Sequence, residues 1–197
     1  MQFVDLLCIF TPKILRMKQL LFLLFCCVGF LTVLAQPSGK PRRMPGTEGK
    51  DPHPEAKPNS PLPVFQLIDA NRKTWTNKNI PAHHKVIFAM FNPGCSHCDD
   101  FGALIHRLQD SLKNTTVIMM TFEENFKELK TFLQKSGLDQ QKNVHVGICN
   151  NGFILGHFMP GYTIPQVMIY SKQKKLKQVL YEAISSQDLL RYLGVPE

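Results

Sequence analysis

The chain has 197 residues, of which 44% are hydrophobic, with 23 Lys and Arg against 15 Asp and Glu and six cysteines. This length allows one domain of ordinary size plus accessory segments, and such a core needs no disulfide staples. Because the basic excess is scattered along the chain, we expect a solvated basic surface and no nucleic-acid partner.

The first 35 residues are typical of an export signal. Lys18 precedes an apolar run over residues 20–35, and small residues near the end of this run predict cleavage after Ala35. The run is shorter than the roughly 20 residues of a transmembrane helix, so an uncleaved membrane anchor is the alternative. Residues 1–16 are interpreted as an extension from a misassigned upstream start. We therefore predict an exported, periplasmic protein.

A proline-rich segment, residues 36–62, follows the export signal. It contains almost no large apolar residue, so burial cannot offset its ordering entropy and we predict a disordered linker. The folded domain is expected to cover residues 63–197. Removal of the signal would leave Cys95, Cys98 and Cys149, and three cysteines cannot build a disulfide scaffold. Cys149 is expected to pack as a small apolar core residue.

Apolar runs and turn residues predict alternating strands and helices in this domain. Two short strands, residues 64–69 and 73–77, should flank a turn, and the continuous apolar runs over 85–91 and 115–121 are typical of buried central strands. A helix should begin directly after the second cysteine of the CSHC motif, because its apolar side chains recur at steps of three and four residues.

The last part of the chain adds a hairpin and a closing helix. The order of elements predicts an α/β fold with parallel strand and helix units, right-handed crossovers and then an antiparallel pair. A left-handed glycine should end the second helix, and a serine should cap the last one. These expected features are the second helix around residues 126–133 ending at Gly137, strands over 143–150, 166–170 and 177–181, and a cap at Ser185 or Ser186.

The motif Cys95-Ser96-His97-Cys98 carries the clearest chemical signal. Structural zinc would need four ligands, and the histidines show no ligand spacing, so we expect no metal. Haem attachment would need a histidine directly after the second cysteine, where Asp99 stands. A redox dithiol needs its first cysteine at a helix N-terminus, whose free amides favour a thiolate, and Cys95 has that position. Cys98, one turn later, could attack a mixed disulfide formed at Cys95.

The strand before CSHC, the helix after it and the segment GYTIPQVMIY before the hairpin resemble the thioredoxin fold. Within that fold, the chain resembles the exported TlpA-like and ResA-like thiol-disulfide oxidoreductases, which are related to the AhpC/TSA group. The segment LPVFQLIDANRKTW resembles the N-terminal strand pair of that subgroup, and the likeness covers residues 62–195. It implies a mixed sheet flanked by helices, with Cys95 as nucleophile and Cys98 as resolving thiol. It also implies that Ile164 and Pro165, joined by a cis peptide bond, bind an extended substrate segment.

The chain departs from the family pattern around the motif. A glycine replaces the tryptophan that precedes the first cysteine in thioredoxin. Ala89 and Phe101 stand where thioredoxin and the ResA-like proteins carry a carboxylate. No proton acceptor for Cys98 is therefore secure, and Asp99 and Asp100 are the candidates.

Ser96 and His97, between the two cysteines, are the candidates for redox tuning. The strongly oxidising members of the superfamily also carry a histidine between their cysteines. His97 would stabilise the Cys95 thiolate and make the disulfide easier to reduce, and Ser96 would add a hydroxyl contact. The alternative is a His97 side chain that only faces solvent at the helix start.

We therefore predict an extracytoplasmic thiol-disulfide oxidoreductase that acts on protein thiols or disulfides without a cofactor. Its partners would be protein substrates and a membrane-bound or soluble thiol redox protein, and the net direction of transfer stays open. A thiol peroxidase of the AhpC/TSA type is one alternative, although Asn92 stands where it would need a threonine or serine. A thioredoxin-like binding module with a structural cysteine pair is the non-enzymatic alternative.

Overall fold

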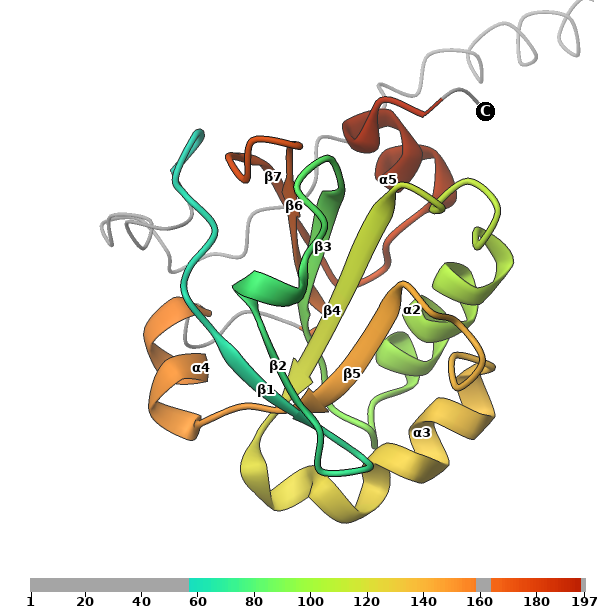
Figure 1. The fold of residues 1–197 in the computed structure, drawn as a ribbon. Coiled ribbons are helices and arrows are strands. Elements are labelled where there is room, and N and C mark those ends of the chain that lie inside the picture. Colours follow the sequence, from blue (N-terminus) through green and yellow to red (C-terminus); the bar gives the residue numbers. More distant parts are fainter. Residues whose placement is uncertain (1–56, 159–163, 196–197) are drawn as a thin grey trace, which may run out of the picture. The chain divides into compact units, whose positions relative to one another are not determined.

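A seven-stranded sheet lies at the centre of the part of the chain that the structure describes, residues 57–158 and 164–195 (Figure 1). In this computed structural model, β3, β4 and β5 run parallel, and β1 and β6 flank them in the antiparallel direction. The expected export signal lies outside the described residues. The strands, in the order in which they lie in the sheet, are β2 Thr74–Thr76, β1 Gln66–Asp69, β5 Val144–Ile148, β4 Thr115–Thr121, β3 Lys85–Met90, β6 Gln166–Tyr170 and β7 Leu176–Tyr181.

The central strands are buried because their sequences are nearly continuous apolar runs. Every residue of β4 is buried, and so are the four inner residues of β3. Their side chains alternate between the two faces of the sheet. In β3, Ile87 and Ala89 belong to one core cluster, whereas Val86 and Phe88 belong to the other. The two clusters define the two layers that cover the sheet.

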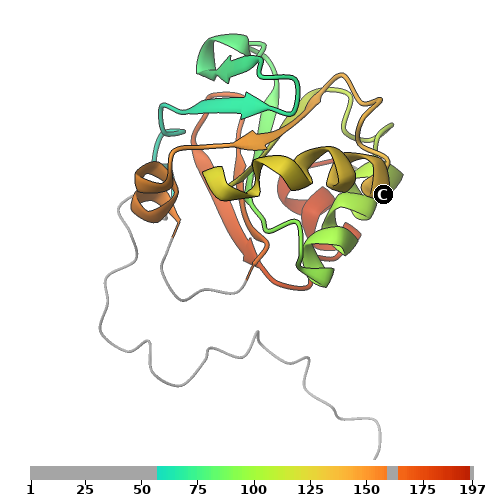
Figure 2. The same cartoon turned by 90° about the horizontal axis from the view of Figure 1, so that it is seen from below.

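Helices cover both faces of the sheet (Figure 2). α2 (Ser96–Arg107), α3 (Leu129–Ser136) and α5 (Ser186–Leu193) pack on one face, and α4 (Asn151–His157) packs on the other. Gly102 permits the close approach of α2 to α3, because a Cβ atom there would lie only 2.8 Å from a side-chain atom of α3. This packing holds α2, which carries the cysteine motif, against the sheet.

The structure confirms the expected α/β fold and the order of its elements. β4 and β6 have the predicted bounds, and Gly137 and Ser185 cap their helices as expected. The second helix differs, since a 3-10 segment, η3 Glu123–Glu128, precedes α3. α4 was not predicted, although Asn150 is its signal: the Asn150 side chain accepts hydrogen bonds from two amides of the first turn.

The expected start of the folded domain, residue 63, is a few residues late. The amide of Asn59 donates to the carbonyl of Leu176 at 2.9 Å, and the amide of Leu176 donates to the carbonyl of Ser60 at 2.8 Å. The side chain of Leu62 is buried in the core. Residues 57–62, called the leading segment below, therefore extend the hairpin edge instead of acting as a linker. Backbone pairing and the burial of Leu62 offset the entropy of ordering this segment.

Candidate active site

Cys95 lies between the carboxyl end of β3 and the first residue of α2, where it forms the N-cap of the helix. A tight turn built by Asn92 places it there. The side chain of Asn92 accepts from the amide of Gly94 at 2.9 Å, and its carbonyl accepts from the amide of Cys95 at 3.1 Å. Asparagine closes such turns by bonding the backbone two residues ahead. The half-buried Cys95 thiol is thus held at a helix N-terminus, as the sequence predicts.

Cys98 lies one turn further along α2 and is fully buried. Its sulfur accepts a hydrogen bond from the amide of Asn92 at 3.4 Å. Ala89 and Phe101, which stand at the two positions where the resemblance would place a carboxylate, belong to the same buried apolar cluster. Burial raises the pKa of the Cys98 thiol far above its ordinary value, and the amide of Asn92 opposes this shift only in part. Cys98 is therefore a protonated thiol at neutral pH.

The segment before β6 brings a carbonyl group to the cysteine motif. The peptide bond between Ile164 and Pro165 is cis, as the resemblance implied. The Cys95 thiol donates to the carbonyl oxygen of Ile164 over 3.9 Å. This contact arises because β6 pairs antiparallel with β3, so that Gln166 lies opposite Met90 and the residue before it meets the end of β3. The two predicted substrate-binding residues thus lie beside the predicted nucleophile.

The predicted tuning residues are less closely engaged. Ser96 and His97 are both exposed, and neither side chain makes a hydrogen bond within the described ranges. They lie in the first turn of α2, as predicted, but among the described residues neither side chain forms a hydrogen bond with a cysteine sulfur. A tuning role for either residue stays a prediction.

The two candidate proton acceptors have different surroundings. Asp99 pairs with Lys135 of α3, with Oδ2 2.5 Å from Nζ, and its side chain is only 22% exposed. Its Oδ1 atom is buried and has no partner among the described residues. Asp100 is exposed to solvent. The charge of Asp99 adds to the effects that raise the pKa of Cys98, so of the two carboxylates Asp99 is the one coupled to this thiol.

Cys149, the third described cysteine, is buried on the other face of the sheet. It belongs to the core cluster that includes Phe65 and Ile154, and its thiol donates to the carbonyl of Gln66 at 3.2 Å. Burial raises its pKa. This confirms the prediction that Cys149 packs as a core residue.

Sequence comparison provides no family. No protein-family model and no curated protein matches this chain. Solved structures do match it. A DsbF homologue from Corynebacterium diphtheriae is 14% identical, with a TM-score of 0.58 over 78% of this chain and 96% of that chain. The chain has the thioredoxin fold.

Two further solved structures agree with this thioredoxin-fold assignment. The thioredoxin domain of a thiol-disulfide oxidoreductase from Bacteroides vulgatus is 12% identical, with a TM-score of 0.56 over 70% of this chain and 96% of that chain. A secreted disulfide oxidoreductase from Mycobacterium tuberculosis, homologous to Escherichia coli DsbE, is 11% identical, with a TM-score of 0.52 over 66% and 94%. The similarity to this chain therefore covers nearly the whole of each matched structure.

Sequence reasoning missed one residue of the thioredoxin-fold site. Asn92 makes three of the contacts that position the two cysteines, through its side chain, its carbonyl and its amide. Its signal is the sequence Asn-Pro-Gly, which is typical of a turn.

Within residues 57–158 and 164–195, no three His, Cys, Asp or Glu side chains gather as metal ligands. In the same ranges, no helix is long and apolar enough to cross a membrane.

Proposed function

We propose that this chain is a thiol-disulfide oxidoreductase that exchanges disulfides with protein substrates. The observation that carries the proposal is the placement of Cys95 at a helix N-terminus, 3.9 Å from the carbonyl of Ile164, with the buried Cys98 one turn behind it. A nucleophilic thiol needs favourable backbone dipoles and access, and a resolving thiol needs proximity and protection. Cys95 has the properties of the nucleophilic thiol, and Cys98 has those of the resolving thiol.

In the reductive direction, the Cys95 thiolate attacks one sulfur of a substrate disulfide. The substrate S–S bond breaks, its other sulfur leaves as a thiolate and takes a proton, and Cys95 becomes joined to the substrate. Cys98 then gives up its proton and attacks the sulfur of Cys95. The second substrate thiol is released, and the dithiol becomes a Cys95–Cys98 disulfide that has passed two electrons to the substrate. The oxidative direction is the reverse.

The carbonyl of Ile164 is suited to bind the substrate backbone. The residue lies beside Cys95, just before the first paired residue of β6, where an extended peptide segment could pair with it. Such pairing would hold the substrate disulfide in line with the attacking sulfur. The half-buried Ile164 side chain packs against the same core cluster as Cys98. Pro165 is buried and holds this segment against the core.

Comparison with solved structures supports the general activity. The structures from Bacteroides vulgatus and Mycobacterium tuberculosis are described as disulfide oxidoreductases, and the latter as secreted. Together with the apolar run over residues 20–35, this supports an exported and periplasmic protein. The redox partner would be a membrane-bound or soluble thiol protein of the same compartment, and the reaction would need no cofactor.

Trapping of the mixed disulfide tests the proposal. The reduced protein should accelerate the reduction of insulin disulfides by dithiothreitol, and Cys95→Ser should abolish the acceleration. When the pre-reduced Cys98→Ser protein is mixed with insulin in the absence of dithiothreitol, it should accumulate a covalent adduct between Cys95 and insulin, because the resolving thiol is missing. Cys149→Ser is the matched control and should retain full activity. Equal activity of the Cys95→Ser and wild-type proteins would instead favour a binding module with a structural cysteine pair.

A further inference from the structure

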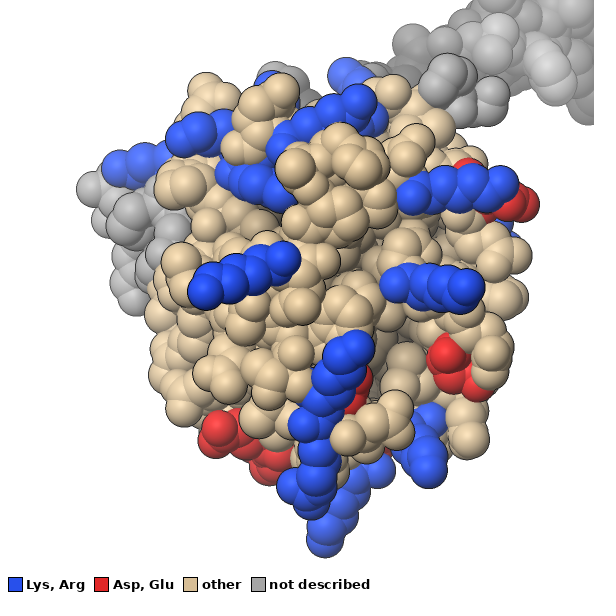
Figure 3. Space-filling model, in the orientation of Figure 1, with Lys and Arg blue, Asp and Glu red and all other residues tan. Residues whose placement is uncertain are grey.

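The end of the sheet opposite Cys95 is basic. Three adjoining segments at this end contain no acidic residue. These are the leading segment, residues 81–85, which end at the first residue of β3, and residues 171–177, which form the β6–β7 turn and the start of β7. Figure 3 shows a group of Lys and Arg side chains at the upper end of this face; further Lys and Arg side chains lie across its middle and lower end, and acidic side chains lie at its right edge and lower end. We call these three segments the basic end. Its exposed lysines are Lys57, Lys172, Lys175 and Lys177.

Lys174 holds the basic end together from inside. Its ammonium group donates to the carbonyl of His84 at 2.7 Å and to those of Pro81, Ala82 and Lys172 at 3.2 to 3.3 Å. The leading segment joins the same turn, since the amide of Leu62 donates to the carbonyl of Lys174 at 2.9 Å. Segments far apart in the sequence are thus fixed into one surface, and the exposed lysines project from a rigid base.

The composition of the basic end favours a diffuse anionic surface over a specific macromolecule. Its four exposed cations are all lysines, which act as point charges, and none is an arginine suited to paired recognition of one phosphate. The three segments contain no Phe, Trp or Tyr, so they offer neither a stacking platform for nucleic-acid bases nor an aromatic anchor for a protein interface. None of these four lysines makes an ion pair within the described ranges.

The path of the chain adds a second argument. The chain enters the described unit at the basic end, and only residues 36–56 separate this point from the apolar run over residues 20–35. A membrane that the apolar run entered would thus be connected to the fold through the basic end.

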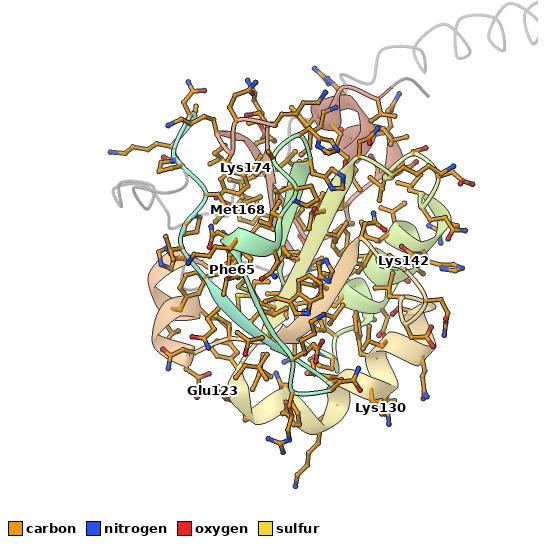
Figure 4. The ribbon with its side chains drawn as sticks, viewed as in Figure 1. Phe65, Glu123, Lys130, Lys142, Met168 and Lys174 are labelled. Carbon is orange, nitrogen blue, oxygen red and sulfur yellow. The ribbon has the colours of Figure 1, made fainter. Side chains whose placement is uncertain are left out.

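We propose that the basic end binds the surface of a membrane that contains anionic phospholipids. Lysines close to such a surface each raise the partition coefficient by roughly fivefold. β3 leads away from this end, from Lys85 toward Cys95, over about 20 Å. In Figure 4, Lys174 lies at the upper end of the view and Lys130 at the lower end. Binding would thus turn the cysteine motif away from the lipid, and the inference does not depend on the redox activity.

Lysine footprinting of the full chain tests this proposal. The chain is mixed with vesicles of phosphatidylcholine alone or with added phosphatidylglycerol, and each lysine is acylated and quantified by mass spectrometry. We expect the acylation rates of Lys57, Lys172, Lys175 and Lys177 to fall at least fivefold on the anionic vesicles only, and to recover at high salt. Lys127 and Lys130, exposed at the other end, serve as internal controls and should react at unchanged rates.

A matched pair of variants distinguishes membrane binding by the basic end from membrane binding by the basic residues outside the described ranges. In K172Q/K175Q/K177Q, Lys57 should lose most of its protection on anionic vesicles. In K127Q/K130Q/K142Q, which removes the same charge from other exposed positions, protection should stay. Equal protection of all lysines, or none, would overturn the proposal. Protection by a short DNA duplex or by polyglutamate, but not by anionic vesicles, would also overturn it and assign the surface to that class of partner.

Discussion

The sulfur of Cys95 lies 3.9 Å from the carbonyl oxygen of Ile164, although 69 positions separate them in the chain. The antiparallel pairing of β6 with β3 creates this contact, because it brings the start of β6 to the end of β3. The thiol is thereby placed beside the segment that we propose to bind an extended substrate chain.

Ile164→Ala should separate protein substrates from small ones. The side chain is half-buried, so its truncation removes the exposed apolar surface beside Cys95 that a docked polypeptide would contact, and leaves the carbonyl and both cysteines in place. We expect kcat/KM for insulin to fall about tenfold, mainly through KM. The rate with glutathione disulfide should stay unchanged, because that molecule is too small to use the contact. A parallel loss for both substrates would show that the variant has damaged the cysteine site itself.

His97→Pro tests the tuning of the redox pair. The side chain lies in the first turn of α2, where proline is tolerated, so the helix should persist. If His97 stabilises the thiolate of Cys95, its loss should shift the reduction potential to more negative values by on the order of 20 to 30 mV. Equilibration with glutathione measures this shift. Asp100→Asn, also exposed in the first turn, is the control, and an unshifted His97→Pro potential would mean that His97 only faces solvent.

The buried thiols should make the reduced protein less stable at alkaline pH. Burial raises the pKa of Cys98 above its ordinary value of 9.0, so below pH 9 both the folded and the unfolded chain keep the proton. Above pH 9 the unfolded chain releases it and the folded chain does not. The free energy of unfolding should then fall by up to about 1.4 kcal/mol per pH unit for this group.

Urea unfolding of the reduced protein between pH 7 and pH 10 checks this loss. The pH dependence should be shallower in Cys98→Ala than in the wild type, because one of the raised pKa values has been removed. Cys149→Ala provides a second case, since burial also raises the pKa of Cys149. Identical pH dependence in all three proteins would contradict the buried, protonated state of these thiols.

Trp75 should report the titration of His145. The two rings are stacked with centroids 3.6 Å apart, and Trp75 is the only tryptophan of the chain. Burial and the nearby Lys73 lower the pKa of His145 from 6.5 to about 4, and Asp69 opposes the shift. Trp75 fluorescence should therefore change near pH 4 and not near pH 6.5. His145→Gln should remove the change.

The same shift predicts an acid-sensitive fold. Above pH 6.5 His145 is neutral in both the folded and the unfolded chain, so it has no effect on stability there. Between pH 6.5 and pH 4 the unfolded chain binds a proton that the folded chain does not, and stability falls. The loss should reach about 2 kcal/mol, once the solvent-exposed part of the ring is allowed for. The difference in the free energy of unfolding between the wild type and His145→Gln should therefore change between pH 7 and pH 4.5. An unchanged difference would contradict this prediction.

Lys174→Met should destabilise the fold through the carbonyls that it leaves without a donor. The ammonium group serves four carbonyl oxygens in two separate segments, and methionine keeps the length of the side chain but none of these bonds. We expect a loss of about 1 to 3 kcal/mol in the free energy of unfolding. Lys172→Met, at an exposed position of the same turn, should change it by less than about 0.5 kcal/mol. Equal effects of both variants would show that Lys174 contributes only its charge.

The sequence alone determined the strand and helix pattern, because buried strands and amphipathic helices have distinct periods. The apolar run of β4, the left-handed Gly137 and the cap at Ser185 could all be located from local sequence. The same holds for Cys95, which had to follow a buried strand and precede a helix. The leading segment was assigned to the linker instead, because its pairing partner at Leu176 is distant in the chain.

Only the tertiary structure decided which residues meet at the site. The two carboxylates after the motif look equivalent in sequence, yet Asp99 is half-buried beside Lys135 of another helix and Asp100 faces solvent. Likewise, no local pattern places the carbonyl of Ile164 beside Cys95 or seats Lys174 among four carbonyl oxygens. Local propensity acts over a few residues, whereas burial, pKa and long-range hydrogen bonds depend on which strands become neighbours in the sheet.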